Sequence, residues 1–399
     1  MHILAVNSGG SSIKFELFAM KKEQETSLLR GTIKRLYRSD SYLEESYNGL
    51  TQKKNIPDLD HERGLHCMIE AILQSCLIGD IQEIDAIGIK LINGGKKIME
   101  TSLIDENVIQ ALEEVSGVTS VHNPPALLAI NIFRKLTPTI PLVGVFETTF
   151  HRSIPLPHRT YGLPWKITEQ YGLEKLGFHG NSYRYITERM PTLTPRTQKM
   201  VIAHLGSGCS ICAVKEGKSF DISSGFTPQS GIIMSTRPGD FEPQIITYLE
   251  EKEGLSPQEI NRLLTKDSGL KGISGISGEL WEIEKKAQEG NLRARLAVDV
   301  FVYQTKKYIG AFTALLNGLD SLVFTGGIGE NDFFIRERIC ENLDYLGIEI
   351  DQEKNRSAIG KERQIGKGRV EIWVVPTNEE LMVARETFAL ITQRKEATE

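Results

Sequence analysis

Cysteine is scarce in this chain: five of its 399 residues are cysteines, and their spacing forms no disulfide framework. Cys209 and Cys212 have the CxxC spacing found in zinc and redox sites, but no second pair accompanies them. The alternating residues around them predict a β-strand, on which two positions three apart point to opposite faces. We therefore expect both to be small buried residues rather than a metal or redox site.

Long apolar runs and a strong charge of either sign are also missing. No apolar run approaches the ~20 residues that a membrane-spanning helix needs. The first residues show no basic region followed by an apolar core, so we expect no secretory signal. The 47 basic and 52 acidic residues leave a formal net charge of −5, which gives no reason to expect a nucleic acid or a membrane as a partner. We expect a cytoplasmic protein in which local basic residues do any phosphate binding.

Glycine, by contrast, is concentrated in two similar hairpins. Residues 3–15 form an apolar strand, a turn of glycine and serine, and an alternating strand, and residues 200–214 repeat this pattern. Small residues let the backbone approach a ligand closely, and successive N–H groups in such a turn can bind an anion. A lone turn is weak evidence because hairpins need such residues anyway. Two copies, with Lys14 just past the first, indicate two similar domains that grip a polyphosphate, as in a nucleotide-dependent phosphotransferase.

Strand and helix patterns alternate along both halves of the chain, which predicts an α/β fold. Strands are expected at 84–92, 141–146, 321–324 and 370–375, and helices at 61–77, 105–115, 293–316 and 378–391, with Asp105 as the N-cap of the second helix. The polar stretch 39–60 is expected to form surface excursions. We predict an N-terminal domain over residues 1–150 and a C-terminal domain over 151–377, with a final helix (378–399) that returns to the N-terminal domain.

Two loops place a basic residue among small ones. Residues 177–182 flank His179 with glycines, which bury little, so we expect this imidazole to face a cleft; a capping histidine is the open alternative. Residues 235–240 present Arg237 in a loop suited to anion binding, and an arginine paired with a nearby acid is equally compatible with the sequence.

Three further positions fit the ends of structural elements. Residues 324–331 follow a strand and precede a helix, a context in which a glycine turn can hold a phosphate or a ribose, although a plain βα loop has the same spacing. Glu147 ends a strand, where ligands gather in α/β domains. His122 precedes Pro124, which indicates a helix N-terminus.

Together these segments resemble the acetate kinase family from about residue 3 to residue 390. The matching stretches are Asn7–Lys14, Val121–Pro124, Gly177–Gly180, His204–Gly208, Gly225–Pro228, Ser268–Gly275, Gly327–Asn331 and Pro376–Leu381. The resemblance implies a duplicated actin/hexokinase-like (ribonuclease H-like) fold of two domains with a central cleft, a homodimer, and ATP with Mg²⁺ (or Mn²⁺). It also implies in-line transfer of the ATP γ-phosphoryl group to a short carboxylate, acetate first, giving an acyl phosphate and ADP.

The resemblance implies roles for individual residues as well. The metal ion would be held by Asn7 and Glu379. The catalytic residues would be Glu147, His179, Arg237 and His122. The acid would be bound by Lys90, Ile92, Val121, Phe178 and Pro228, with the bulk of Ile92 favouring two carbons. The nucleotide and its phosphates would be bound by Lys14, Ser12, His204, Leu205, Gly206, Ser207, Gly208, Glu279, Leu280, Trp281, Gly327, Ile328, Gly329, Glu330 and Asn331.

Several positions depart from the family pattern. Lys90 replaces the arginine that binds the acid, Asn93 replaces a histidine, and Glu147 replaces the catalytic aspartate. Other replacements are Gly10 for a serine, and Glu279 and Trp281 for an acid and an arginine near the adenosine. Lysine lacks the two-pronged contact of arginine, and losing one charge-assisted hydrogen bond costs roughly 1.5–3 kcal/mol. The longer Glu147 can compensate. The alternatives are a kinase for another small acid, such as propionate or butyrate, and a nucleotide-binding relative that has lost acyl transfer.

Overall fold

The computed structural model describes residues 1–95, 97–115 and 123–397. The chain divides into two compact units, and each is described by itself. Unit 1 comprises Met1–Thr149 and Asn378–Glu399, and unit 2 comprises Phe150–Thr377. Among the described residues, no helix is long and apolar enough to cross a membrane.

The described strands of unit 1 form one mixed sheet in the order β5-β4-β3-β2-β1-β6-β8-β7. Their bounds are β1 His2–Ser8, β2 Ser12–Lys21, β3 Gln24–Lys34, β4 Tyr42–Tyr47, β5 Leu50–Asn55, β6 Ala86–Leu91, β7 Ser102–Leu103 and β8 Leu142–Phe146. The helices are α1 His61–Gln74, α2 Glu106–Glu114, α3 Asn123–Leu136 and α15 Glu379–Glu396. As predicted, Asp105 caps α2, because its side chain accepts a hydrogen bond from the backbone N–H of Val108.

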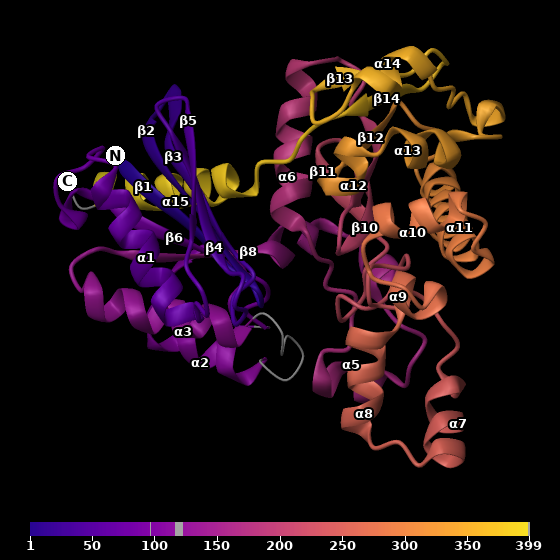
Figure 1. Cartoon of the computed structure of the whole chain (residues 1–399), viewed down its shortest axis with the longest axis horizontal. Helices are drawn as coiled ribbons and strands as arrows, with labels where there is room; N and C mark the ends of the chain where they lie inside the picture. The colour runs from indigo at the N-terminus through magenta and orange to yellow at the C-terminus, as the bar shows by residue number, and fades with distance from the viewer. Residues whose placement is uncertain (96, 116–122, 398–399) are drawn as a thin grey trace. The chain divides into compact units, whose positions relative to one another are not determined.

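Helices cover both faces of this sheet. On β1, Leu4 and Val6 belong to the apolar core that α1 and α3 share, whereas Ile3 and Ala5 face the core that contains α15. Figure 1 shows α15, in yellow, beside the indigo strands of unit 1, although the two are at opposite ends of the sequence. A strand buried on both faces reads as a continuous apolar run, which explains the start of the sequence.

The described strands of unit 2 form a second sheet in the order β11-β10-β9-β12-β14-β13. Their bounds are β9 Lys199–Leu205, β10 Cys209–Lys215, β11 Lys218–Ile222, β12 Ser321–Thr325, β13 Arg363–Gln364 and β14 Glu371–Val374. The helices are α4 Leu156–Arg159, α5 Trp165–Tyr171, α6 Gly180–Arg189, α7 Gln244–Glu253, α8 Pro257–Arg262, α9 Gly269–Ser274, α10 Leu280–Gln288, α11 Leu292–Leu315, α12 Gly326–Asn331, α13 Phe333–Cys340 and α14 Gln352–Ser357. Val201 and Ala203 of β9 share a core with α11, and Met200 and Ile202 share one with α6.

The two sheets repeat one topology. The order β3-β2-β1-β6-β8 in unit 1 and the order β11-β10-β9-β12-β14 in unit 2 both consist of antiparallel strands followed by parallel ones. Both predicted glycine hairpins are present, as β1–β2 and β9–β10. The predictions of an α/β fold and of a repeated strand–turn–strand unit are therefore confirmed.

Two local predictions have different outcomes. Cys209 and Cys212 lie in different apolar cores, so they do point to opposite faces of β10. Burial raises the pKa of each thiol to about 12, which keeps both protonated and unreactive. The polar stretch 39–60, in contrast, forms the paired strands β4 and β5, which extend the sheet. The surface location was predicted correctly for β5, since all its residues are exposed, but the strand pairing was not predicted, because exposed residues carry no apolar alternation.

The close approach of α15 to β6 generates a stability prediction. A Cβ atom at Gly88 would lie 2.2 Å from Thr387 Oγ1 and 2.8 Å from Val383 Cγ1 of α15. We expect Gly88→Ala to lower the free energy of unfolding by about 1–3 kcal/mol through overpacking. Gly310→Ala is the matched control, because nothing lies within 4 Å of that Cβ position in α11, and it should stabilise by about 0.5–1 kcal/mol. Urea unfolding of both variants checks this, and equal shifts would contradict the packing of α15 on β6.

Candidate active site

In unit 1 the parallel strands β1, β6 and β8 bring three polar residues to one edge of the sheet. Val6 pairs with Ile89, so Asn7 and Lys90 follow at the same level. Leu91 of β6 pairs with Phe146, and Glu147 comes directly after it. The carboxyl ends of parallel strands are where ligands bind in open α/β sheets.

Lys90 is held between two carboxylates at this edge. Its Nζ lies 2.6 Å from Glu147 Oε1 and donates a hydrogen bond to Glu379 Oε2 at the start of α15. The three side chains are 11%, 3% and 15% exposed. Burial alone would lower the pKa of Lys90, but the two carboxylates outweigh it and raise this pKa above its usual value. Lys90 therefore stays charged at neutral pH.

A histidine hydrogen-bonds the backbone of the turn between β1 and β2. The Gly9 N–H donates to the Ser12 carbonyl at 2.9 Å, and the buried His61 donates from Nε2 to the Gly9 carbonyl at 2.7 Å. Tyr37 Oη lies 2.8 Å from the other nitrogen of this ring. Lys14 pairs with Asn7 across the hairpin and is exposed. His61 was not predicted as a site residue, since only the fold brings it to the turn.

In unit 2 the glycine turn after β9 lies beside the start of α12, and the glycine turn predicted within residues 324–331 forms that helix instead. A Cβ at Gly206 would lie 3.8 Å from the Gly327 nitrogen, because β9 and β12 are neighbours and His204 pairs with Thr325. The side chain of Glu330 folds back onto the start of α12, where its Oε1 accepts hydrogen bonds from the Gly326 and Thr377 N–H groups, at 2.9 and 3.1 Å. Asn331 likewise donates to the Gly327 carbonyl at 2.9 Å. These side chains therefore hydrogen-bond the backbone at the start of α12. A Cβ atom at Gly327 would have no atom of the described residues within 4 Å, so the backbone there is open.

His179 and Arg237 converge on the turn formed by residues 206–208. A Cβ at Gly208 would lie 2.8 Å from Arg237 Nη2 and 3.2 Å from His179 Nε2, so the glycine makes room for both. Arg237 Nη1 donates to the Pro228 carbonyl at 2.6 Å, and Nη2 makes no hydrogen bond to any described residue. Burial lowers the pKa of Arg237 from its ordinary value. Two donors at one glycine turn form an anion-binding arrangement.

A buried histidine holds the loop that carries His179. His151 donates from Nε2 to the Phe178 carbonyl at 3.0 Å, and Ser219 Oγ lies 2.9 Å from its Nδ1. The ring lies where a Gly177 side chain would be, since a Cβ there would be 2.5 Å from His151 Cγ. Burial lowers the pKa of His151 to about 3, so the ring is neutral. His151 was not predicted as a site residue.

The remaining predicted residues are spread over both units. Ile92 is half-buried in unit 1, whereas Phe178 and Pro228 belong to unit 2. In the expected adenosine segment, Leu280 packs in the core of unit 2, while Glu279 is exposed and Trp281 is 63% exposed. Val121 and His122 lie outside the described residues.

Asn93 has a local structural contact of its own. It is buried, and its Oδ1 accepts the Gly95 N–H at 3.0 Å, which closes the turn after β6. An asparagine suits this position because its short side chain reaches its own backbone two residues further on. This replacement therefore stabilises the turn beside Lys90.

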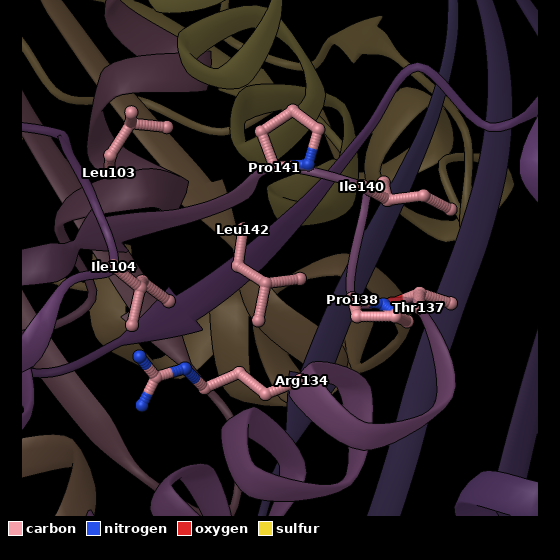
Figure 2. Close-up of a pocket in the computed structure, with 8 residues that line it drawn as sticks. All are labelled: Leu103, Ile104, Arg134, Thr137, Pro138, Ile140, Pro141 and Leu142. Carbon is pink, nitrogen blue, oxygen red and sulfur yellow. The ribbon is translucent and has the colours of Figure 1, made fainter.

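A pocket of about 230 Å³ lies at the other end of the unit 1 sheet. Figure 2 shows its lining, which includes Arg134 at the end of α3 and Pro141 and Leu142 at the start of β8. Arg134 is paired with Glu106 at 2.7 Å. Because β8 begins here and ends at Phe146, just before Glu147, the pocket is remote from the edge that carries Lys90, and no predicted site residue lines it.

Known proteins match this chain over nearly its whole length. The model of the Acetokinase family matches residues 2–385. An acetate kinase from Halothermothrix orenii is 42% identical over 98% of this chain and 100% of its own. Among solved structures, an acetate kinase from Porphyromonas gingivalis has 37% identity and a TM-score of 0.87, covering 98% of this chain and 99% of its own. A propionate kinase from Francisella tularensis has 33% identity and a TM-score of 0.89, covering 97% and 99%.

The buried His151 generates a prediction of pH dependence. Its folded pKa of about 3 lies below the unfolded value of about 6.5. The unfolded state therefore binds a proton first, and stability is lost as the pH falls below 6.5. Between pH 7.5 and pH 5 this group alone should cost about 2 kcal/mol.

Urea unfolding of the wild type and of His151→Gln at both pH values measures this contribution. The variant should lose less stability on acidification than the wild type, by about 2 kcal/mol. Equal losses in the two proteins would show that His151 is not held neutral.

Proposed function

Because the chain belongs to the acetokinase family, we propose that it transfers the γ-phosphoryl group of ATP to a short carboxylate, with acetate as the first candidate acceptor. The observation that carries this proposal is 42% identity, over nearly the whole length, to proteins named acetate kinase. In the reaction, a carboxylate oxygen of the acid attacks the γ-phosphorus while the bond from that phosphorus to ADP breaks. The products are an acyl phosphate and ADP.

His179 and Arg237 are our candidates for stabilising the transferring group. Both present nitrogen atoms to the turn at Gly208, where N–H groups could meet the equatorial oxygens of the phosphoryl group. Charge spreads over these oxygens in the transition state, so preorganised donors lower the barrier. The turn at residues 206–208 and the start of α12 at residues 327–331 would hold the nucleotide phosphates and ribose.

Charge balance suggests how Lys90 takes part. With Glu147 and Glu379 ionised, the cluster of Lys90 and these two carboxylates carries a net charge of −1. An anionic acid would be repelled by such a cluster. A divalent cation on Glu379 changes the total to +1, and the site then attracts the acceptor carboxylate. We propose that Lys90 and Glu147 orient the acid in this state.

The residues present fit a magnesium ion that takes some of its ligands from the protein and the others from water and the substrate phosphates. No group of three or more His, Cys, Asp or Glu side chains suited to a metal occurs in the described ranges. Mg²⁺ is commonly held by one or two carboxylates together with waters and substrate phosphates, so Glu379 and the Asn7 amide oxygen are sufficient. When bound, the ion would neutralise phosphate charge; Mn²⁺ takes similar oxygen ligands.

The identity of the acceptor acid is the part of this proposal that an assay must decide. Propionate is the second candidate, because a propionate kinase is among the similar structures. Trapping acyl phosphate with hydroxylamine, from ATP and a panel of acetate, propionate and butyrate, tests the choice. We expect acetate to give the highest kcat/KM. A preference of more than about tenfold for another acid selects the alternative substrate.

Variants make the same assay specific to the site. Arg237→Ala should lower kcat by about 10²–10³, as expected for the loss of a transition-state donor. Arg189→Ala is the matched control, since Arg189 forms a partly exposed pair with Glu362 at 2.8 Å, and it should stay within about twofold. No product with any acid, together with thermal stabilisation by ATP, would select a nucleotide-binding relative without acyl transfer.

We also propose that two chains form a homodimer through unit 2. Trp165 and Tyr171 of α5 and Tyr248 of α7 are each about 60% exposed. Exposed aromatic residues of this kind are enriched in the cores of protein interfaces. Light scattering should give the mass of two chains, and Trp165→Glu should lower that mass. A single-chain mass for the wild type would contradict the proposal.

A further inference from the structure

A buried chain of hydroxyl groups ends on the imidazole of His179. Tyr183 Oη of α6 lies 2.6 Å from Ser210 Oγ of β10, and Ser210 Oγ lies 2.8 Å from His179 Nδ1. Tyr183 and Ser210 are fully buried. Neither residue was predicted as part of the site. Tyr183 follows His179 by four residues, and Ser210 pairs with His204 across the β9–β10 hairpin.

We propose that Tyr183 and Ser210 are positioning residues that hold His179 in the tautomer with its proton on Nε2. A serine hydroxyl has one proton to donate, so the partner that gives it a hydrogen bond decides where that proton goes. If the phenol of Tyr183 donates to Ser210 Oγ, the serine proton is directed to His179 Nδ1. The ring nitrogen at Nδ1 then accepts, and Nε2 carries the hydrogen.

The burial of Tyr183 determines the direction of these hydrogen bonds, from Tyr183 through Ser210 to His179. Burial raises the pKa of Tyr183 well above its usual value, so the phenol keeps its proton. A buried hydroxyl proton needs an acceptor, and Ser210 Oγ is the side-chain oxygen within hydrogen-bond distance. The reverse direction, with His179 donating from Nδ1, would leave the phenol proton without that acceptor.

Two other buried histidines show the same arrangement. Tyr37 Oη lies 2.8 Å from Nδ1 of His61, and Ser219 Oγ lies 2.9 Å from Nδ1 of His151. In both rings Nε2 faces a backbone carbonyl, at 2.7 and 3.0 Å, and must therefore carry the proton. In these two rings a hydroxyl at Nδ1 accompanies the Nε2–H tautomer that the carbonyl identifies. His158, whose Nδ1 faces the Phe220 carbonyl at 3.0 Å and has no such hydroxyl contact among the described residues, carries its proton on Nδ1 instead.

Backbone and stacking contacts fix the orientation of the same ring. His179 has φ of 59°, in the left-handed region that costs a non-glycine residue free energy, so its surroundings must maintain it. Its ring stacks on His204 with centroids 4.3 Å apart and planes 18° apart, and His204 Nδ1 in turn lies 2.9 Å from Ser182 Oγ. Nε2 is thereby aimed at the Gly208 turn, where Arg237 Nη2 also points.

The consequence for catalysis rests on the proposed function. With the proton on Nε2, the ring offers a donor to the anionic oxygens of the transferring phosphoryl group. With the proton on Nδ1, it would present a lone pair to those oxygens and repel them. Loss of the serine hydroxyl should therefore lower kcat by about tenfold, the factor that corresponds to one hydrogen bond. The KM values for ATP and the acid should change by less than about twofold, because the lost interaction belongs to the transition state.

The tautomer can be measured without substrates. Long-range ¹H–¹⁵N correlation spectra of ¹⁵N-histidine-labelled protein distinguish protonated from unprotonated ring nitrogens, and His179→Gln assigns the signals among the eight histidines. We expect an unprotonated Nδ1 and a protonated Nε2 in the wild type. Ser210→Ala and Tyr183→Phe should each shift the signals of His179 toward a mixture of tautomers. Ser219→Ala, which removes the equivalent hydroxyl from His151, should leave those of His179 unchanged.

Two results would overturn the proposal. One is a wild-type His179 with its proton on Nδ1, and the other is a Ser210→Ala protein with unchanged His179 signals. Failure of the proposed function is a separate outcome, because it appears as absence of acyl phosphate in the wild type while the spectra still decide the tautomer. In an active enzyme, the expected pattern is a lower kcat with unchanged KM in both variants.

Discussion

The parallel pairing of the central strands is the constraint on which the rest of this structure depends. In unit 1, β1, β6 and β8 run in one direction, so Asn7, Lys90 and Glu147 reach the same edge of the sheet. In unit 2, the parallel pair β9 and β12 brings the glycine turn after β9 beside the start of α12 in the same way. Antiparallel neighbours could not do this, because their ends alternate between opposite edges.

Close packing around these edges determines which residues present functional groups and which hold them. Lys90 is held between carboxylates and stays charged, whereas His151 is buried, with the cations Arg184 and Lys175 as its charged neighbours, and stays neutral. The same physical terms, burial and neighbouring charge, lead to opposite outcomes in the two places. His151, His61 and Ser210 do not belong to any recognisable motif, yet each contacts a segment that does.

Three departures from the family pattern have a common location. Lys90, Asn93 and Glu147 lie at the ends of β6 and β8, where Lys90 pairs with Glu147 and Asn93 closes its own turn. Gly10, Glu279 and Trp281 lie elsewhere, and His179 and Arg237 keep the expected residues. Glu147 reaches Lys90 at 2.6 Å, so the longer acid and the lysine form a matched pair. The cluster of Lys90 with Glu147 and Glu379 carries a net charge of −1 when both acids are ionised.

The sequence by itself determined the α/β class, the repeated glycine hairpins, the family and the capped start of α2, because periodicity, turn chemistry and motif order are local properties of the chain. It did not determine the strands β4 and β5, since every residue of β5 is exposed and Leu43 is the one buried residue of β4. Nor could it show that Lys90 binds Glu379, that Glu330 accepts the Thr377 N–H, or that Ser210 contacts both Tyr183 and His179. Those contacts join residues distant in sequence, and only the pairing of strands and the packing of helices against them brings the atoms within hydrogen-bond distance.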